Sequence, residues 1–225
     1  ARGRRRARIA WRACTAARPA CMPRCARPPS LPTYFKAGDS QGDHAAWISD
    51  AEQAFKQAVA HACTGAAAHA QSSTNILRGG RARCCCFAGP MPLLDGGWGL
   101  AWWARAAAVR RCARAPGWGP ADIDHLARWA RGPLGVLWQG PHATSWDARR
   151  PVHSTWQISV LEARLNLALL TANASELGWA SAQLRSVVAN SVGARGELPL
   201  DDPRDFVHVQ FAVGGLMQAA EAREA

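Results

Sequence analysis

The chain has 225 residues and a mass of 24.1 kDa, which suits one folded domain with a substantial buried core. Hydrophobic residues make up 48% of it, which argues against a disordered chain, and no apolar run approaches the roughly 18 residues of a membrane-spanning helix. The formal charge is +11, but nine Arg and no acidic residue fall within residues 1–30. The rest of the chain holds 18 basic and 16 acidic residues and is therefore nearly neutral.

Residues 1–30 form an Arg-rich segment that is free of acids, as transit peptides are. The segment lacks the apolar stretch of a secretory signal and does not begin with Met. A basic tail on a nearly neutral body favours a targeting segment, a translated leader or a disordered arm over a nucleic-acid surface. We therefore expect residues 1–30 to be a targeting or disordered segment, residues 31–225 to be the folded domain, and nucleic acid not to be the partner.

The cysteine pattern is typical of neither a zinc finger nor a simple disulfide framework. Cys21 and Cys25 have the spacing of half a zinc site, but no second Cys or His pair follows at finger distance. The adjacent Cys84, Cys85 and Cys86 lie between turn-forming Gly and Pro residues, which indicates a surface loop or an error in the gene model. We expect no metal and no cofactor. The cysteine pattern leaves open whether the protein belongs to an oxidising or a reducing compartment.

Hydrophobic periodicity predicts a first helix over residues 43–63 and, after a break rich in Gly, Pro and Cys, a second over residues 100–113. The predicted inward face of the first helix consists of Trp47, Ile48, Ala51, Phe55, Ala58, Val59 and Ala62. In the second helix Trp103, Ala107 and Val109 are predicted inward, and Arg105, Arg110, Arg111 and Arg114 are predicted to form a polar stripe.

Four further helices are predicted, and they complete an all-α fold. Pro120 is well placed to begin a helix whose buried stripe is Ile123, Leu126, Ala127 and Ala130. Residues 154–171 follow the helical period, Ser175 is predicted to cap a helix that runs to about residue 192, and residues 206–223 form the last helix. Periodicity alone leaves a bundle, a solenoid and an α/α toroid open.

Seven short segments, taken in chain order, resemble the alginate lyase family, the poly(β-D-mannuronate) lyases. They are residues 34–40 followed by 50–55, then 77–80, 103–108, 153–156, and finally 197–199 leading to 211–212. The similarity spans about residues 31–222. It implies an alginate lyase-like helical barrel, an incomplete α/α toroid that lacks a helical stretch after Val109 and the C-terminal helices of the family.

Two family signatures indicate the site residues. The signature Asn-Asn-His-Ser-(aromatic or Thr)-Trp stands here as Pro151-Val152-His153-Ser154-Thr155-Trp156, so His and Trp are kept and both Asn are lost. A loop Arg followed by Tyr at the start of the next inner helix falls on Arg204 and His208. The resemblance implies that the catalytic residues are His153, His208 and Arg204, and that the substrate-binding residues are Trp156, Trp103, Arg105, Lys36 and Tyr34.

Lyases of this family cut uronate polysaccharides by β-elimination, which removes the C5 proton and expels the O4 oxygen. A positive or hydrogen-bonding group must neutralise the carboxylate, a base must take the proton, and an acid must protonate O4. His153 and His208 could act as acid or base, and Arg204 could hold the carboxylate. Val152 has no donor where the family has Asn, and Tyr34, the only Tyr of the chain, lies in the wrong segment for an acid–base role.

Each of these residues also has an ordinary structural interpretation. His153 and His208 could be helix-start or helix-face histidines, and Arg204 could pair with a nearby acid in its loop. Four of the eleven Trp, Trp98, Trp102, Trp103 and Trp156, are candidates for a sugar-stacking wall, although Trp at helical spacing is more often core. Arg78, Arg81, Arg105 and Arg149 could steer a polyanion or form a solvated charged face.

The leading hypothesis is a metal-independent polysaccharide lyase that cleaves mannuronate-rich alginate or a related uronate polymer. By resemblance we expect a periplasmic or secreted monomer, with an acidic polysaccharide as its partner. The first alternative is a catalytically impaired protein that binds acidic glycans on the same scaffold. Two others are a basic-armed nucleic-acid binder and a truncated chain that does not fold.

Overall fold

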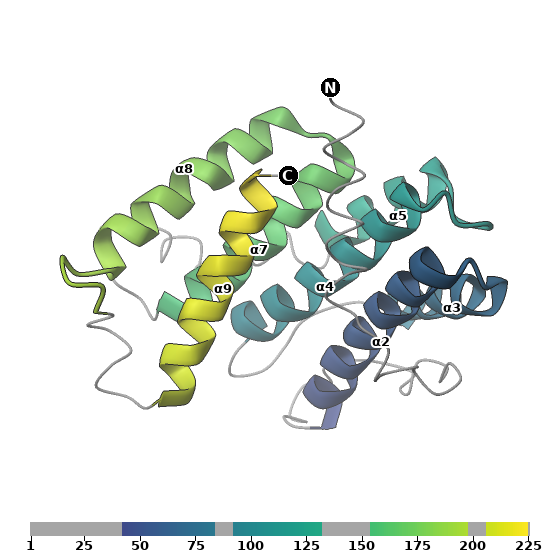
Figure 1. Cartoon of the computed structure of the whole chain (residues 1–225), viewed down its shortest axis with the longest axis horizontal. Helices are drawn as coiled ribbons and strands as arrows, with labels where there is room; N and C mark the ends of the chain where they lie inside the picture. The colour runs from purple at the N-terminus through teal and green to yellow at the C-terminus, as the bar shows by residue number, and fades with distance from the viewer. Residues whose placement is uncertain (1–41, 84–91, 132–153, 198–205, 225) are drawn as a thin grey trace.

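The computed structural model describes residues 42–83, 92–131, 154–197 and 206–224, which form seven α-helices and no strand within those ranges (Figure 1). The helices are α2 (Gly42–Thr64), α3 (Ala67–Arg83), α4 (Pro92–Cys112), α5 (Pro120–Arg131), α7 (Ser154–Thr171), α8 (Ala174–Ser191) and α9 (Phe206–Glu224). The predicted all-α class is confirmed for these residues. None of the described helices is long and apolar enough to span a bilayer.

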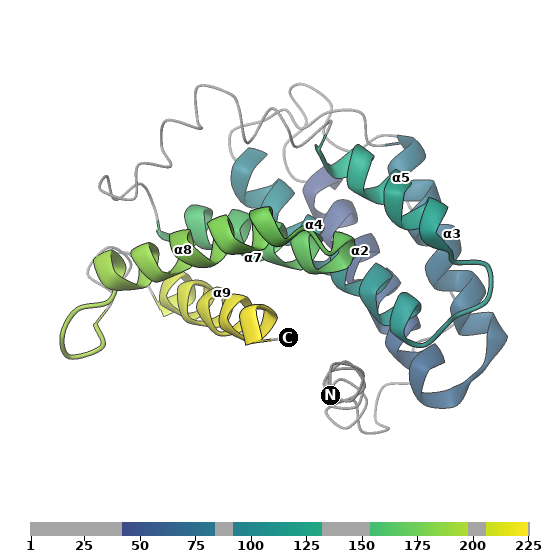
Figure 2. The ribbon, with the colours of Figure 1, turned by 90° about the horizontal axis from the view of Figure 1, so that it is seen from above.

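Four helices pack in succession to form one layer. Helix α4 contacts α2 on one side and α7 on the other, and α7 also contacts α9. In the view of Figure 1 these four helices run upward or to the right, whereas α8 runs the opposite way along α7. Helix α3 packs on α2 and α8 packs on α7, so each of these two connecting helices covers the helix that precedes it. Figure 2 shows α3 and α9 at opposite ends of this arrangement.

The larger apolar core lies around α4 and is built on three tryptophans. Trp47 of α2 and Trp103 of α4 stack with ring centroids 5.3 Å apart, and Trp129 of α5 lies tilted 5.8 and 5.9 Å from them. Each such ring buries on the order of 200 Å² on folding, which makes this cluster a main source of hydrophobic stabilisation. A second cluster joins α7, α8 and α9 through Ile158, Leu161, Leu165, Ala180, Leu184, Val187, Ala212 and Ala219.

Two glycines allow α4 to approach its neighbours closely. A Cβ atom on Gly99 would lie 1.7 Å from Nε1 of Trp47, and one on Gly97 would lie 2.7–2.9 Å from the side chain and backbone of Ser159. These separations are far below van der Waals contact. Glycine at both positions is therefore what lets α2 and α7 pack against α4 at this distance.

The chain between residues 67 and 99 differs from the sequence-based expectation. A break was expected there, but α3 occupies residues 67–83 and α4 begins at Pro92 rather than at residue 100. The interior of α3 contains the run Ser-Ser-Thr-Asn and two adjacent Gly, which are poor helix formers, so its sequence carries a weak signal. It is stabilised instead by packing of Ala70, Ser73, Ile76 and Leu77 against α2 and the core.

The predicted helix faces are confirmed in some helices and corrected in others. All four predicted inward residues of α5 are buried. Arg110 was expected in a polar stripe but is fully buried, because its head group reaches backbone carbonyls of α3 and the α4–α5 turn. Ser175 was expected to cap α8, but the cap is Asn173, whose Oδ1 accepts a hydrogen bond from the Glu176 N–H at 3.1 Å.

Candidate functional site

Four of the eight predicted catalytic and binding residues lie outside the described part of the chain. Tyr34, Lys36, His153 and Arg204 all fall in the omitted ranges. Trp156 belongs to the first turn of α7, and His208 belongs to the first turn of α9. The predicted roles of these residues stay predictions.

Chain connectivity relates the two predicted catalytic segments to neighbouring helices. Ser154, which follows His153, begins α7, and Phe206, two residues after Arg204, begins α9. Helices α7 and α9 pack directly, and both begin on the lower left side of the molecule in Figure 1. The chain therefore enters both helices at the same end of the layer.

Trp103 lies in the core. Its side chain has an exposed fraction of 0% and stacks on Trp47, so it presents no ring face to a sugar in this structure. The core interpretation of this residue matches its burial. Trp98 and Trp102, the neighbouring candidates for a sugar-stacking wall, are both partly exposed.

The partly exposed face of α4 carries aromatic, cationic and apolar side chains. Trp98, Trp102, Arg105 and Val109 follow one another at intervals of four, three and four residues, so they share one face of the helix. We call these four residues the α4 stripe. The guanidinium of Arg105 lies 5.4 Å from the Trp102 ring centroid, and Phe55 and Trp102 make an edge-type contact with ring centroids 5.0 Å apart. The stripe is therefore held by contacts with α2.

Arg105 connects α4 to α7 and α9. Its Nε donates to Oδ1 of Asn166 at 3.2 Å, and its Nη1 donates to Oε1 of Gln218 at 2.9 Å. Its Nη2 lies 3.1 Å from Oε1 of Glu162, and the side chain keeps an exposed fraction of 16%. Because the guanidinium already has partners on two helices, a ligand carboxylate would have to share or replace these contacts.

Glu162 is the acid of this cluster, and its pKa is strongly shifted. Burial raises its pKa from 4.5 to about 7, and the charge of Arg105 only partly opposes the rise. Its Oε1 makes a charge contact with Arg105 but no hydrogen bond, which leaves the carboxylate incompletely satisfied. A carboxyl group that titrates near neutral pH can either accept or donate a proton, and such groups are frequent at functional sites.

Sequence reasoning selected Arg105 but missed Glu162, Asn166 and Gln218. Glu162 is the only acid of α7 and directly follows Val160 and Leu161, and an acid in a helix of this apolar character is the signal that could have identified it. Nothing in the sequence indicates that Gln218, more than one hundred positions away from Arg105, would contact it.

The described residues contain no group of three His, Cys, Asp or Glu side chains that could hold a metal ion. Cys63, at the end of α2, takes part in a disulfide, whereas the exposed Cys112 is a free thiol. No protein-family model, curated protein or solved structure matches the chain. The functional argument therefore rests on the chain's own residues.

Proposed function

We propose that this protein is a polysaccharide lyase that cleaves mannuronate-rich alginate or a related uronate polymer by β-elimination. The observation that carries the proposal is the location of the family-like segments. Within the described residues they fall in α2, at the end of α3, in α4, at the start of α7 and in α9. Four of these five helices, α2, α4, α7 and α9, pack in succession, which is how the inner helices of an α/α toroid would be arranged.

In the proposed reaction the chain supplies three roles. Arg204 pairs with the substrate carboxylate and lowers the cost of negative charge at C5. One imidazole, of His153 or His208, takes the C5 proton, and the electron pair forms the C4–C5 double bond as the bond to O4 breaks. The other imidazole donates a proton to O4, which completes the elimination without a metal.

The reaction is tested by following the ultraviolet absorbance of the new double bond with the full chain and mannuronate-rich, guluronate-rich and glucuronate polymers. We expect His153→Ala to lower the rate at least about 100-fold, because it removes an acid–base group. We expect Val152→Asn to raise the rate by about tenfold to 100-fold, because an amide donor can stabilise the developing oxyanion.

His125→Ala is the matched control, since His125 is exposed on α5 and takes no part in the proposed reaction. Its rate should equal that of the parent. Circular dichroism must first show each variant to be as helical as the parent. If the folded parent forms no double bond on any of the three polymers, the lyase proposal is rejected.

The α4 stripe favours a second candidate function, binding of an acidic glycan without cleavage. Partly exposed indole rings beside a guanidinium match the apolar face and the acid group of a uronate. In this case Trp102→Ala should weaken polymer binding about tenfold, measured by affinity electrophoresis in gels that contain the polymer. His125→Ala, at an exposed residue on α5, should leave binding unchanged.

We propose further that the helix layer is an arc of an α/α toroid, and that the protein is an exported monomer. The two-layer packing of α2, α3, α4, α7, α8 and α9 supports the first point. The disulfide at Cys63 supports export, because disulfides persist mainly in oxidising compartments. Size-exclusion chromatography coupled to light scattering tests the monomeric state.

A further inference from the structure

A hollow of about 520 Å³ lies between the C-terminal ends of α4 and α7 and the start of α5, away from the α4 stripe. Its volume falls within the range of ordinary small-molecule sites, roughly 300–1,000 Å³. The lining residues are Arg111, Arg114, Ala115, Trp118, Gly119, Pro120, Ile123, Asp124, Leu170 and Thr171. The lining thus combines an apolar floor with two arginines and one acid.

The turn that forms one wall of the hollow is held by two arginines that do not line it. Arg110 is fully buried, donates to the carbonyls of Ala70 and Pro116, and lies 5.8 Å from the Trp118 ring centroid. Burial lowers the pKa of Arg110 to about 10, so it stays charged at neutral pH. These contacts fix the turn before any ligand binds.

Arg78 of α3 fixes the same turn from the outside. It donates to both carboxylate oxygens of Asp122, at 2.9 and 3.0 Å, and to the carbonyl of Gly117 at 2.9 Å. Asp122 is therefore neutralised by Arg78 and also accepts from the Gly119 N–H. A wall fixed in this way lowers the ordering cost of binding.

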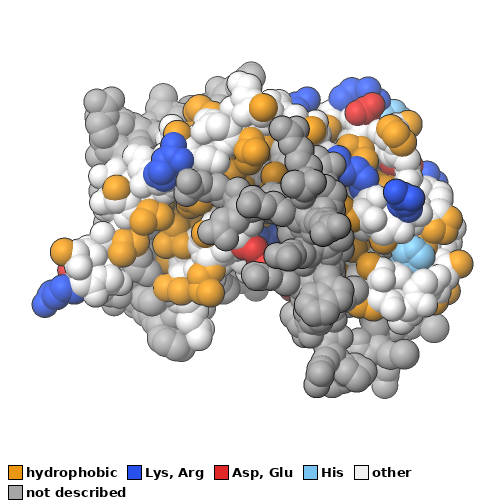
Figure 3. All heavy atoms as spheres, turned by 45° about the horizontal axis from the view of Figure 1, so that its top comes forward, with side chains coloured by type: hydrophobic (Ala, Val, Ile, Leu, Met, Phe, Trp, Pro, Cys, Tyr) orange, Lys and Arg blue, Asp and Glu red, His pale blue; other side chains and the backbone are white. Residues whose placement is uncertain are grey.

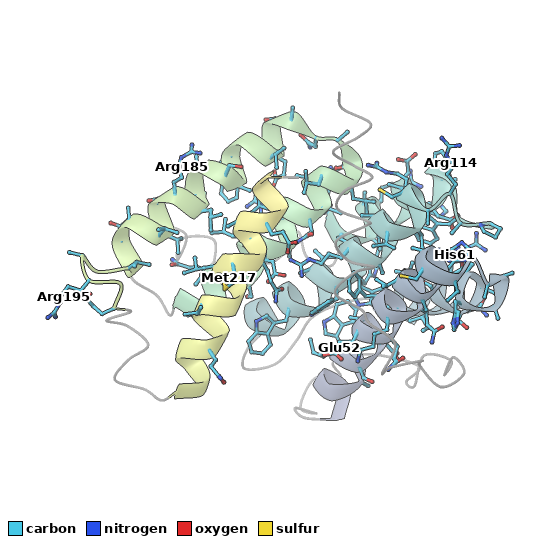
Figure 4. The ribbon with its side chains drawn as sticks, in the orientation of Figure 1. Glu52, His61, Arg114, Arg185, Arg195 and Met217 are labelled. Atoms are coloured by element: carbon cyan, nitrogen blue, oxygen red, sulfur yellow. The ribbon has the colours of Figure 1, made fainter. Side chains whose placement is uncertain are left out.

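The charges that remain at the hollow favour an anion. Arg111 uses Nη1 to donate to the carbonyl of Leu170 at 2.6 Å, and its other N–H groups have no partner among the described residues. The side chain of Arg114 makes no hydrogen bond or ion pair within the described ranges, and Figure 4 shows it extending from the turn after α4 toward solvent. Asp124 opposes these two charges in part. Lys and Arg side chains also gather over this half of the molecule in Figure 3.

The backbone at Arg114 is unfavourable for any residue other than glycine. Arg114 has a φ of 50°, and the bonds Arg114 N–H to Arg111 O and Ala115 N–H to Arg110 O close the end of α4 around it. Glycine is the preferred residue at this position of a helix terminus. Ala172 occupies the matching position at the end of α7 with a φ of 52°, so the chain offers an internal comparison without a charged side chain.

We propose that this hollow binds a small organic oxyanion, a carboxylate or phosphate carried on an apolar body. The acid group is held by Arg111 and Arg114, whose planar guanidinium groups suit two-oxygen ligands. The apolar body lies against Trp118, Ile123 and Leu170. This site is separate from the proposed glycan site and does not depend on the lyase activity.

The test is isothermal titration calorimetry of the full chain with phenyl phosphate, benzoate and inorganic phosphate at low salt. We expect phenyl phosphate to bind at least about tenfold more tightly than inorganic phosphate, because only the former buries a ring. The comparison of benzoate with phenyl phosphate distinguishes a carboxylate site from a phosphate site. Equal affinity for phenyl phosphate and inorganic phosphate would mean that only exposed arginines bind, and would overturn the proposal.

Arg114→Gly should reduce the affinity for phenyl phosphate at least about fivefold while raising the melting temperature by about 2–4 °C. Ala172→Gly should raise the melting temperature similarly and leave binding unchanged. Arg185→Ala removes one exposed charge on the other side of the molecule and should also leave binding unchanged (Figure 4). If Arg114→Gly binds phenyl phosphate as tightly as the parent does, Arg114 has no role in binding and the proposal fails.

Discussion

Glu162 and Arg105 carry opposite charges, yet burial dominates the chemistry of the acid. The side chain of Glu162 is almost inaccessible to water. Ionisation therefore creates a full charge that water cannot solvate, and the charge gains only its contact with Arg105. This balance is why its pKa is raised to about 7 instead of lowered. The folded protein therefore holds a proton on Glu162 at pH values where the unfolded chain has released it.

We predict that Glu162→Gln changes the pH dependence of stability. Between pH 4.5 and about 7 the folded parent binds more protons than the unfolded chain, so its free energy of unfolding falls as pH rises through this window. The loss levels off above about pH 7 at about 3 kcal/mol. Glu162→Gln should remove this fall, which urea unfolding across the window would measure. Parallel pH curves for the two proteins would contradict it.

Arg110 and Trp103 show what residue-level reasoning can and cannot determine. The helical period correctly placed Trp103 inward, because apolar positions repeat on one face. The same period placed Arg110 outward because it is charged. Its burial depends on the carbonyl of Ala70, forty positions earlier in the chain, and on that of Pro116 in the turn after α4, and the helical period indicates neither contact.

At the scale of the elements, the packing of α4 depends on positions that have no side chain. Gly99 faces Trp47 and Gly97 faces Ser159, so the two sides of α4 each meet a neighbouring helix at a glycine. Glycine normally weakens a helix interior by about 1 kcal/mol relative to alanine. Its presence at these positions is explained by the close approach that it permits.

We predict opposite effects for two Gly→Ala substitutions in helices. Gly99→Ala should destabilise the fold by about 1–3 kcal/mol or more, because the new methyl group overlaps the Trp47 ring. Gly178→Ala, in α8, meets no atom within 4 Å and should stabilise by about 0.5–1 kcal/mol. Urea unfolding of both variants tests the pair, and a stabilised Gly99→Ala protein would show that the α2–α4 contact is looser than described.

Helix α3 shows why one element escaped sequence analysis. Its polar composition lacks both strong propensity and a wide apolar stripe, so no local pattern distinguishes it from a loop. In the folded chain Ser73 donates to the carbonyl of Ala54 across the α2–α3 interface at 2.9 Å. Partner surfaces on other helices supply the stabilisation that propensity does not.

At the scale of the whole molecule, Arg105 joins three helices of the layer. Its contacts with Asn166, Glu162 and Gln218 link α4 to both α7 and α9. Because α9 otherwise packs on α7 through small residues such as Ala212 and Ala219, this polar cluster helps to orient it.

We predict that Arg105→Ala destabilises the protein by about 3–5 kcal/mol at pH 8, where Glu162 is ionised and would lose the one charge partner that it has among the described residues. At pH 5 the loss should be smaller, because Glu162 is protonated. The double variant Arg105→Ala with Glu162→Gln should recover part of the loss at pH 8. Urea unfolding measures all three proteins, and a loss that does not change with pH would argue against this coupling.

The sequence alone determined the helical class, the positions of α2, α5, α7, α8 and α9, and the buried stripe of α5, because these depend on local periodicity and on helix-terminal residues. Of the candidate site, it indicated Arg105 and the aromatic residues around it. Tertiary structure alone decided the existence of α3, the burial of Arg110, the partners of Arg105 and the hollow beside Arg114. These features arise where segments far apart in the chain meet. A local pattern of residues does not indicate which surfaces will face each other in the folded chain.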